Sequence, residues 1–359
     1  MDFHSLIDDF DKIFSTEKLI ADLFFSNKCN LKCLHCYFGY TKNISTPLPY
    51  NTWLRIINDL HKNGVRHFHL SGKESSLEAD SVELVKYIKS KQNTFCGIVS
   101  NGTGHLDYYQ SLISNNIDYI EFSIDGLEEN HNYLRGDNIF HDNVKAIENA
   151  CHIKQQIINI STTLNRLNHN YFLQLVNYFD QVGVKRFFAT PFIEKGNGAN
   201  IKSLSINGDD FALLIEKTFD FINNTSSKGL VIKYCIQHEH ILPSLNKSKF
   251  IQEIVKGYFS KKNDLIFRIN GNTIQLSFNF IEFDYLSQLI VTNDGYILPC
   301  ADDISYTKYS EISLGNLNQS TIDKILAKRK DSLKYQINNS IKFQKLWKEK
   351  MKKEEWKTS

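Results

Sequence analysis

Short hydrophobic runs alternate with longer amphipathic segments over roughly the first two hundred residues, with one such pair about every thirty residues. This alternation is typical of a parallel sheet whose strands are connected by helices. The stripe of Leu54, Ile57 and Leu60, for example, has the period of a helix. Six strands are predicted, at residues 19–26, 66–70, 94–100, 117–124, 157–164 and 185–192. Six βα units form a partial (β/α)6 TIM-like barrel, although the pattern alone also allows an open doubly wound sheet.

The pattern changes after residue 200. A helix is predicted at 209–223, a strand at 230–236 and consecutive strands at 265–299, which indicates an appended α+β extension with a β-meander. Near the end, an apolar stripe that includes Trp347 runs through a lysine-rich segment and predicts a docking helix with a solvated face. The chain is therefore divided into an N-terminal segment (1–18), a parallel core (19–200), an α+β extension (201–330) and a basic C-terminal helix or tail (331–359).

Composition excludes several classes of protein. The 42 lysines and arginines nearly balance the 40 aspartates and glutamates, for a net charge of +2, which argues against a dedicated nucleic-acid binder. A hydrophobic content of 42% excludes a largely disordered chain. There is no apolar run of about 18 residues and no signal peptide, so no membrane association is expected and a cytoplasmic location is predicted.

Three of the seven cysteines are crowded together. Cys29, Cys33 and Cys36 form a Cys-x3-Cys-x2-Cys array directly after the first predicted strand, and three thiolates this close can share one metal centre. A structural zinc site usually has four protein ligands, and no fourth cysteine or paired histidine follows at zinc-finger spacing, although His35 lies within the array. An iron-sulfur cube with one open iron fits this set better. A non-enzymatic zinc or redox-sensing protein is the alternative.

This array, its place after the first strand and the aromatic Tyr37 directly behind it resemble the radical S-adenosylmethionine (SAM) superfamily. The resemblance implies that Cys29, Cys33 and Cys36 hold a [4Fe-4S] cluster and that SAM chelates the fourth iron. It also places Tyr37 among the cofactor-binding residues. It makes residues 19–200 a radical SAM core barrel.

Further motifs of the family follow the ends of the next strands. Gly72 and Glu74 match the family's Gly-Gly-Glu-Pro turn, whose backbone receives the amino group of SAM, whereas Lys73 and Ser75 depart from it. Asn101 follows the third strand and is implied to bind the cofactor. In α/β barrels the loops at the carboxyl ends of the strands converge on one opening, so these motifs can surround one cofactor.

The fourth strand ends in a similar motif. The resemblance implies that Ser123 and Asp125 lie near the ribose of SAM and that Arg135 lies near its carboxylate. The fixed fork of a guanidinium suits such a planar anion. Gly196 and Gly198 follow the sixth strand, where the family often contacts ribose and adenine.

The segment that ends in Cys300 resembles the start of the SPASM or twitch extension, which makes residues 201–330 a SPASM/twitch-like region. That extension normally binds one or two extra iron-sulfur clusters. None is expected here, because no cysteine follows Cys300 and none lies within twenty residues before Gly295. Cys300 is a candidate hydrogen-atom donor, with a plain buried cysteine as the alternative. His238 and His240 are candidate ligands, with a solvated loop as the alternative.

The resemblance implies a radical SAM enzyme that reductively cleaves SAM to methionine and a 5'-deoxyadenosyl radical, which removes hydrogen from an unactivated carbon. Because SPASM-bearing members often modify ribosomal peptides, the expected substrate is a precursor peptide, modified by crosslinking or epimerisation. A small molecule such as a sugar or an antibiotic precursor is the alternative substrate. A flavodoxin- or ferredoxin-type protein is the expected electron donor.

Overall fold

The computed structural model describes residues 19–39, 47–136, 138–237, 265–279, 288–299 and 309–329. Within these ranges the strands form one twelve-stranded sheet, in the order β12-β11-β10-β1-β2-β3-β4-β5-β6-β7-β9-β8. The strands are β1 (Ile20–Ser26), β2 (His67–Gly72), β3 (Phe95–Ser100), β4 (Tyr119–Ser123), β5 (Ile158–Leu164), β6 (Arg186–Pro191), β7 (Val231–Gln237), β8 (Leu265–Ile269), β9 (Asn272–Asn279), β10 (Gln288–Val291), β11 (Tyr296–Leu298) and β12 (Gly315–Asn316). The helices are α3 (Tyr50–Lys62), α4 (Ser81–Lys89), α5 (Leu106–Ser114), α6 (Glu128–Arg135), α7 (Phe140–Lys154), α8 (Phe172–Val182), α9 (Gly208–Asn224) and α13 (Tyr309–Ile312).

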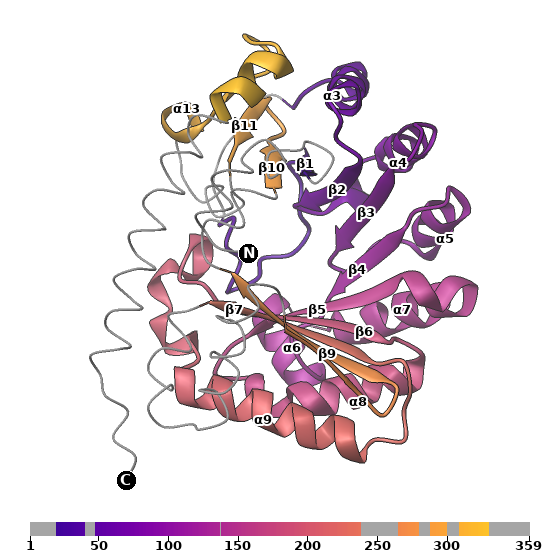
Figure 1. Ribbon diagram of the computed structural model, residues 1–359, viewed down its shortest axis with the longest axis vertical. Helices are drawn as coiled ribbons and strands as arrows, with labels where there is room; N and C mark the ends of the chain where they lie inside the picture. Colours follow the sequence, from indigo (N-terminus) through magenta and orange to yellow (C-terminus); the bar gives the residue numbers. More distant parts are fainter. Residues whose placement is uncertain are drawn as a thin grey trace.

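The parallel core follows the prediction. Strands β1 to β6 pair in chain order and all pairs are parallel, which confirms the partial barrel (Figure 1). Further strands extend this parallel arrangement at both sides, because β7 pairs with β6, β9 with β7, and β10 with β1. The sheet therefore continues across residue 200, and the division of the chain at that point stays a prediction.

The β-meander expected at 265–299 is wrong. Strands β8 and β9 form an antiparallel hairpin at one edge of the sheet, while β10 and β11 form an antiparallel pair near the other edge. The hairpin turn consists of Asn270 and Gly271, whose φ angles of 49° and 79° suit the tight turn between two antiparallel strands. Alternation of hydrophobic and polar residues predicts that a segment is a strand. It does not predict the neighbouring strand, because pairing across the sheet depends on distant segments.

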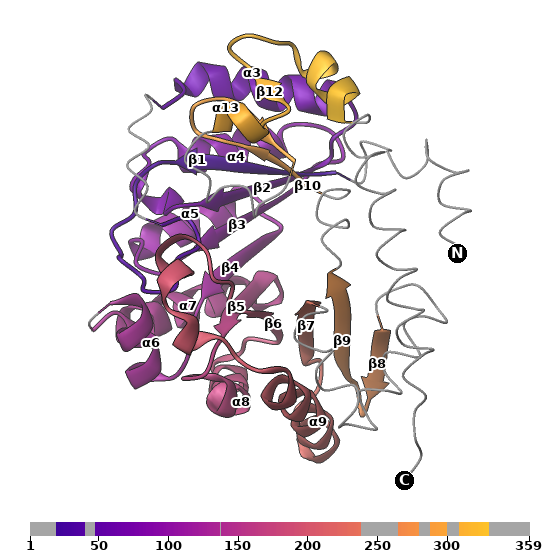
Figure 2. The same cartoon turned by 90° about the vertical axis from the view of Figure 1, so that its left-hand side faces the viewer.

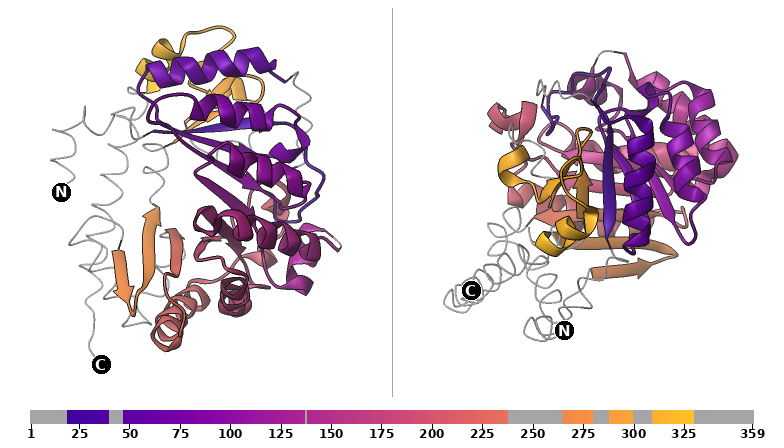
Figure 3. Two further views of the ribbon diagram at one scale, coloured as in Figure 1. Left: turned by 90° about the vertical axis from the view of Figure 1, so that its right-hand side faces the viewer. Right: turned by 90° about the horizontal axis from the view of Figure 1, so that it is seen from above.

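The two faces of the sheet differ in chemistry because successive side chains of a strand point to opposite faces. On one face, Phe68 and Leu70 of β2 join the hydrophobic core with the helices, and the ring of Phe25 packs on Trp53 of α3 at 5.6 Å between centroids. Figure 3 shows the helices that cover this face, and Figure 2 shows the molecule from the opposite side. We call the face turned away from the helices the inner face. Its side chains include Asp22, His67, His69, Tyr119, Glu121, Ser123, Ser161, Thr163 and Lys233.

Several sequence predictions fall outside the described residues. These are the N-terminal segment, the basic C-terminal helix or tail, the candidate ligands His238 and His240, and the candidate hydrogen-atom donor Cys300. None of the helices within the described ranges is both long and apolar enough to cross a membrane.

Candidate active site

The three clustered cysteines lie in the loop that follows β1, at the carboxyl end of the parallel sheet. We call residues 27–39 the cluster loop. Cys29 is exposed, whereas Cys33 and Cys36 are half-buried, and all three are free thiols. In the described part of the chain no three His, Cys, Asp or Glu side chains are grouped to hold a single metal ion. A cube does not require such a group, since each thiolate binds a different iron.

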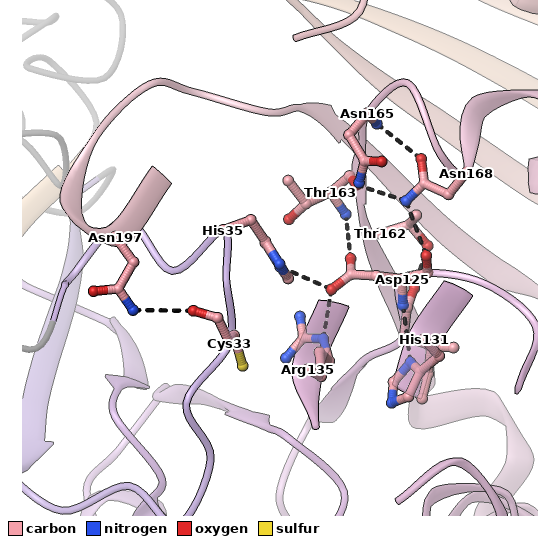
Figure 4. A network of polar contacts seen from close by, with 11 residues as sticks. Cys33, His35, Asp125, His131, Arg135, Thr162, Thr163, Asn165, Asn168 and Asn197 are labelled. Carbon is pink, nitrogen blue, oxygen red and sulfur yellow. Dashed lines mark hydrogen bonds and ion pairs between the residues drawn. The ribbon is translucent and has the colours of Figure 1, made fainter. Parts of the chain in front are cut away.

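Backbone and side-chain hydrogen bonds hold the cluster loop against neighbouring segments. The N–H of Leu34 donates to the carbonyl of Leu134 in α6 at 2.9 Å. Asn197, which follows β6, donates its backbone N–H to the carbonyl of Cys36 at 2.8 Å and its Nδ2 to the carbonyl of Cys33 at 3.0 Å (Figure 4). These bonds connect both half-buried cysteines to a segment more than 160 residues away in the chain. The sequence carried no signal for this role of Asn197.

Gly196 allows the cluster loop to pack directly on the chain after β6. Its φ of 58° is in the left-handed region, and a Cβ there would lie 2.3 Å from the carbonyl oxygen of Tyr37 and 2.4 Å from that of Cys36. Only glycine combines this conformation with such a close approach of two backbones. The contact of Gly196 with the cofactor stays a prediction, whereas its contact with the cluster loop is direct.

We therefore expect Gly196→Ala to displace the cluster loop. The variant should lower the free energy of unfolding by more than the roughly 1–2 kcal/mol of a left-handed alanine and should reduce iron incorporation. The matched control is Gly229→Ala, because Gly229 has a φ of 78° and no atom within 4 Å of its Cβ position. Urea denaturation and iron analysis of both variants test this expectation. Equal losses in the two variants would contradict it.

A buried carboxylate connects the cluster loop to α6. Asp125 follows β4 and is fully buried, and its Oδ2 lies 2.9 Å from Nε2 of His35 and 2.5 Å from Nε of Arg135 (Figure 4). His35 belongs to the cluster loop and its side chain is 6% exposed, while that of Arg135 is 11% exposed. Buried charges are tolerated when they are paired and hydrogen-bonded, and this group satisfies both conditions.

The environment of Asp125 fixes its charge. Burial by itself raises the pKa of this carboxyl, but the charge of Arg135, then His35 and a hydrogen bond from the N–H of Thr163 hold it far below its usual range. The other oxygen, Oδ1, accepts that Thr163 bond at 2.7 Å. Both carboxylate oxygens are therefore engaged by the protein, and Asp125 joins the cluster loop, α6 and β5.

The chain around Asp125 is fixed by neutral groups. Its backbone N–H donates to Nδ1 of His131 at 3.1 Å, and its carbonyl accepts from Nδ2 of Asn168 at 2.9 Å. Burial and then the charge of Arg135 lower the pKa of His131 to about 4, so this ring is neutral at physiological pH. A neutral ring can accept the Asp125 N–H, which a protonated ring could not.

Glu74 makes a second buried connection, between the ends of β2 and β3. Its side chain is buried, and Oε2 accepts the N–H of Asn101 at 2.6 Å. Oε1 accepts the Ser100 hydroxyl at 3.0 Å and the N–H of Ser76 at 3.1 Å. The backbone N–H of Glu74 in turn donates to the carbonyl of Lys28 at the start of the cluster loop. The family-like turn is thus joined to the cysteine array.

Asn101 continues this connection. Its Nδ2 donates to Oδ1 of Asn30 at 2.9 Å, directly beside Cys29, and its Oδ1 accepts from the hydroxyl and N–H of Thr103. Nδ2 of Asn30 completes the set by donating to the hydroxyl of Thr103 at 2.8 Å. The structure therefore brings Glu74 and Asn101, both predicted from sequence, to one side of the cluster loop.

The remaining predicted cofactor residues lie at the same end of the sheet. Gly72 ends β2 with a φ of 104°, and a Cβ there would lie 3.2 Å from the ring of Phe24. Ser123 ends β4 on the inner face and is half-buried. Tyr37 lies in the cluster loop, with its ring 4.7 Å from that of Phe38. Their predicted contacts with SAM stay predictions.

The thiols are suited to binding a metal cluster. Burial raises the pKa of Cys33 to about 11, although the charge of Arg135 opposes this effect. Burial also raises the pKa of Cys29, again against a contribution from Arg135. These thiols would therefore release protons on binding iron, and Arg135 supplies a positive charge that favours the thiolates. The donor set and its charge environment fit a cube held by three thiolates.

Two family profiles match the sequence. The radical SAM superfamily matches residues 23–179, which include the cluster loop, Glu74, Asn101, Asp125 and Arg135. The SPASM iron-sulfur cluster-binding domain matches residues 284–355. That second stretch contains a single cysteine, Cys300, so the prediction of no auxiliary cluster stands as a prediction.

Known relatives and structures agree with these profiles. The sporulation killing factor maturation protein SkfB of Bacillus subtilis is 27% identical over 189 residues, which cover 52% of this chain and 45% of SkfB. A probable GTP 3',8-cyclase of Saccharolobus solfataricus is 23% identical over 253 residues, covering 70% of this chain and 77% of the cyclase. The matched region thus spans less than half of SkfB.

The crystal structure of Streptococcus suis SuiB bound to its precursor peptide SuiA has the same fold. It superposes with a TM-score of 0.63 at 18% identity, covering 89% of this chain and 67% of SuiB. This likeness shows the fold, while the classification rests on the family profiles and the cysteine array that they include. The chain therefore carries a radical SAM superfamily domain at residues 23–179, followed by a SPASM region at residues 284–355.

Proposed function

We propose that this protein is a radical SAM enzyme that cleaves SAM reductively and removes hydrogen from a carbon of a ribosomally made precursor peptide. The observation that carries the proposal is the cluster loop, whose three thiols are held at the carboxyl end of the parallel sheet by the buried Asp125, Arg135 and His35. A solvated or flexible zinc loop does not need such support. The radical SAM superfamily domain also favours an enzyme over the non-enzymatic alternative.

Cys29, Cys33 and Cys36 would hold a [4Fe-4S] cluster, and SAM would complete the coordination of its fourth iron. The cluster, when reduced, supplies the electron that splits SAM into methionine and a 5'-deoxyadenosyl radical. The protein's own part is to bind and orient these groups. The network around Asp125 connects the loop on which all three thiols lie to α6 and β5.

Arg135 is suited to bind the carboxylate of SAM. Its Nε is bonded to Asp125, while its two terminal amino groups have no hydrogen-bond partner among the described residues. A guanidinium held in this way presents a planar pair of donors to a planar anion. Asp125 acts as a positioning residue, because both of its oxygens are already bonded within the protein. Ser123, at the end of β4, is the group we assign to the ribose.

A peptide is the substrate that the relatives favour. SuiB binds the precursor peptide SuiA, and SkfB is a maturation protein. We propose crosslinking or epimerisation as the modification, in the cytoplasm, with a flavodoxin- or ferredoxin-type protein as electron donor. A small-molecule substrate is the second candidate, because the longer match is to a probable GTP 3',8-cyclase.

The test is an anaerobic assay of the purified holoprotein with SAM and dithionite. About four irons per chain and release of 5'-deoxyadenosine are expected. Candidate precursor peptides, encoded next to this gene, are then compared with GTP and a panel of sugars, and products are identified by mass spectrometry. Zinc without iron, or iron without SAM cleavage, would overturn the proposal. Product from GTP or a sugar alone would favour the second candidate.

A further inference from the structure

The inner face of the sheet carries ionisable side chains that the proposed function does not use, and four of them are considered first. Asp22 lies on β1, His69 on β2, Glu121 on β4 and Lys233 on β7. They alternate with residues that pack against the helices, so their side chains point away from the helical layer. None of them belongs to the network around Asp125, and among the described residues none makes a hydrogen bond or an ion pair with the cluster loop. Ionisable groups collected on an inner face indicate a polar site.

Asp22 and His69 form an oriented pair. Nδ1 of His69 lies 2.6 Å from Oδ1 of Asp22, and the Ser71 hydroxyl donates to the same oxygen at 3.2 Å. A carboxylate can only accept, so the neutral ring of His69 carries its proton on Nδ1 and a lone pair on Nε2. That Nε2 atom is buried and has no hydrogen-bond partner among the described residues. A carboxylate that fixes the tautomer of a histidine leaves its other nitrogen ready to exchange a proton.

The groups around His69 come from several strands. On β2, His67 lies two residues away, and on β4 the ring of Tyr119 is 5.5 Å from that of His69. Tyr119 fills the space over Gly97 of β3, where a Cβ would lie 2.0 Å from the ring. Glu121 is the other titratable group of β4 that interacts with His69. His69 therefore lies beside an aromatic ring, is hydrogen-bonded to the Asp22 carboxylate and is within electrostatic reach of Glu121.

Charge opposes burial at this histidine. Burial lowers the pKa of His69, but the charge and the hydrogen bond of Asp22, with a smaller contribution from Glu121, outweigh it, so the pKa is raised. Burial, followed by the charge of His69, lowers the pKa of the neighbouring His67. Burial also raises the pKa of Glu121, against the charges of His69 and Lys233. The pKa values of these two histidines on one strand thus shift in opposite directions, because only His69 of the two is hydrogen-bonded to a carboxylate.

We propose that His69 is a proton acceptor for the bound substrate and that Asp22 is its positioning residue. This inference rests on the proposed function, because the inference requires that the substrate of that reaction binds over the inner face. In the step, an X–H bond of a weakly acidic substrate group breaks, an N–H bond forms at Nε2, and the electron pair stays on X. No electron is gained or lost. Asp22 remains ionised and stabilises the resulting imidazolium.

The chemistry of an imidazole limits the group X–H. A thiol has an ordinary pKa of about 8.5 and an ammonium group about 10.4, compared with about 6.5 for histidine. The raised pKa of His69 reduces the pKa difference between this histidine and either of these groups. A hydroxyl or an amide is far too weak an acid for this transfer. The substrate should therefore present a thiol or an ammonium group to the inner face, and the thiol is the better match.

The first test needs no substrate. The intact holoprotein is treated with diethyl pyrocarbonate, which acylates unprotonated imidazole nitrogens, at a series of pH values, and the sites are mapped by mass spectrometry. His69 should react, with a midpoint above about 6.5. Asp22→Asn should lower that midpoint by about 1–2 pH units, because it removes the charge that favours the protonated ring. The matched control is Asp107→Asn, since Asp107 pairs with His105 at 3.2 Å and both are 81% exposed.

Two outcomes of this test would overturn the proposal. One is a His69 that stays unreactive while His105 reacts, which would mean that Nε2 cannot be reached from the inner face. The other is a pH midpoint for the reaction of His69 in the wild type that is at or below the pKa of an ordinary histidine. This second outcome can be measured even if Asp22→Asn fails to fold. Neither outcome bears on SAM cleavage, so the proposed function is judged separately.

The second test measures turnover. His69→Gln should keep its iron and its release of 5'-deoxyadenosine but lose product by about 100-fold or more. In Asp22→Asn the acidic limb of the pH profile should move to lower pH, since the base form persists there. Peptides with cysteine or lysine as the reacting residue distinguish thiol from ammonium. Full product formation by His69→Gln would overturn the proposal, whereas loss of SAM cleavage in the wild type would count against the proposed function.

Discussion

Asp125→Asn should destabilise the protein by about 3–5 kcal/mol, the usual cost of removing one partner from a buried ion pair. An asparagine would place two N–H groups or one carbonyl where Arg135 and His35 now share a carboxylate oxygen. The positive charge of Arg135 would then be buried without compensation. Since a domain is stable by only about 5–15 kcal/mol, the loss is a large fraction of the total.

This destabilisation should be concentrated at the cluster loop. His35 lies between Cys33 and Cys36, and its bond to Asp125 connects the middle of the array to the sheet. We therefore expect Asp125→Asn to take up less iron even where it remains folded. Urea denaturation of the apoprotein and iron analysis after reconstitution measure the two effects.

Asp142→Asn is the matched control for this variant. Asp142 pairs with Lys145 at 3.9 Å, and the two side chains are 73% and 69% exposed. An exposed pair of this kind contributes little, so the change should stay within about 0.5 kcal/mol and leave iron content unaltered. Equal stability of the two variants would show that the buried network does not support the cluster loop.

Alanine at Cys29, Cys33 or Cys36 should each abolish cluster incorporation, reducing iron from about four atoms per chain to nearly none. A cube held by three thiolates has no protein ligand to spare. Among the described residues the other three cysteines lie outside the cluster loop: Cys96 is buried in β3, Cys151 is buried in α7, and Cys235 is half-buried in β7. None of them can move to the cluster loop without unfolding its element.

Cys151→Ala is the control for the cysteine variants. It removes one buried sulfur, at a cost of at most about 1–2 kcal/mol, and should leave iron content and absorption spectrum unchanged. Iron and sulfide analysis of anaerobically reconstituted protein distinguishes the two groups of variants. Retention of about four irons by any of the three array variants would show that the ligand assignment is wrong.

Local sequence determined the positions of the main elements. The six predicted strands agree with β1 to β6 within about two residues. The reason is that buried parallel strands read as dense runs of apolar residues, and each run is bounded by polar turn residues. The cysteine array is likewise a local signal, since its spacing and its place after a strand are contained in a few residues. The order of the family-like motifs could therefore be read without a structure.

Tertiary structure decided the partners of these residues. Asp125 was predicted to lie near the cofactor, but nothing in its neighbourhood along the chain indicates that His35 and Arg135 would share one of its oxygens. Asn197 was missed for the same reason, because its partners Cys33 and Cys36 are distant in sequence and are contacted through carbonyl groups that every residue has. The sequence contained only a weak indication that His35 belongs to the site, namely its position inside the cysteine array.

The edges of the sheet and its inner face also depended on the fold. Strand β10 pairs with β1, and β9 pairs with β7. The alternation of hydrophobic and polar residues in a strand does not indicate which distant strand will pair with it. Asp22 and His69 are 47 residues apart and meet only because β1 and β2 pair in parallel register. The sequence by itself thus determined the elements and the position of the cysteine array, since these follow from local patterns. The ion pairs that hold the cluster loop and the charges of the inner face arise from long-range packing, which only the tertiary structure decides.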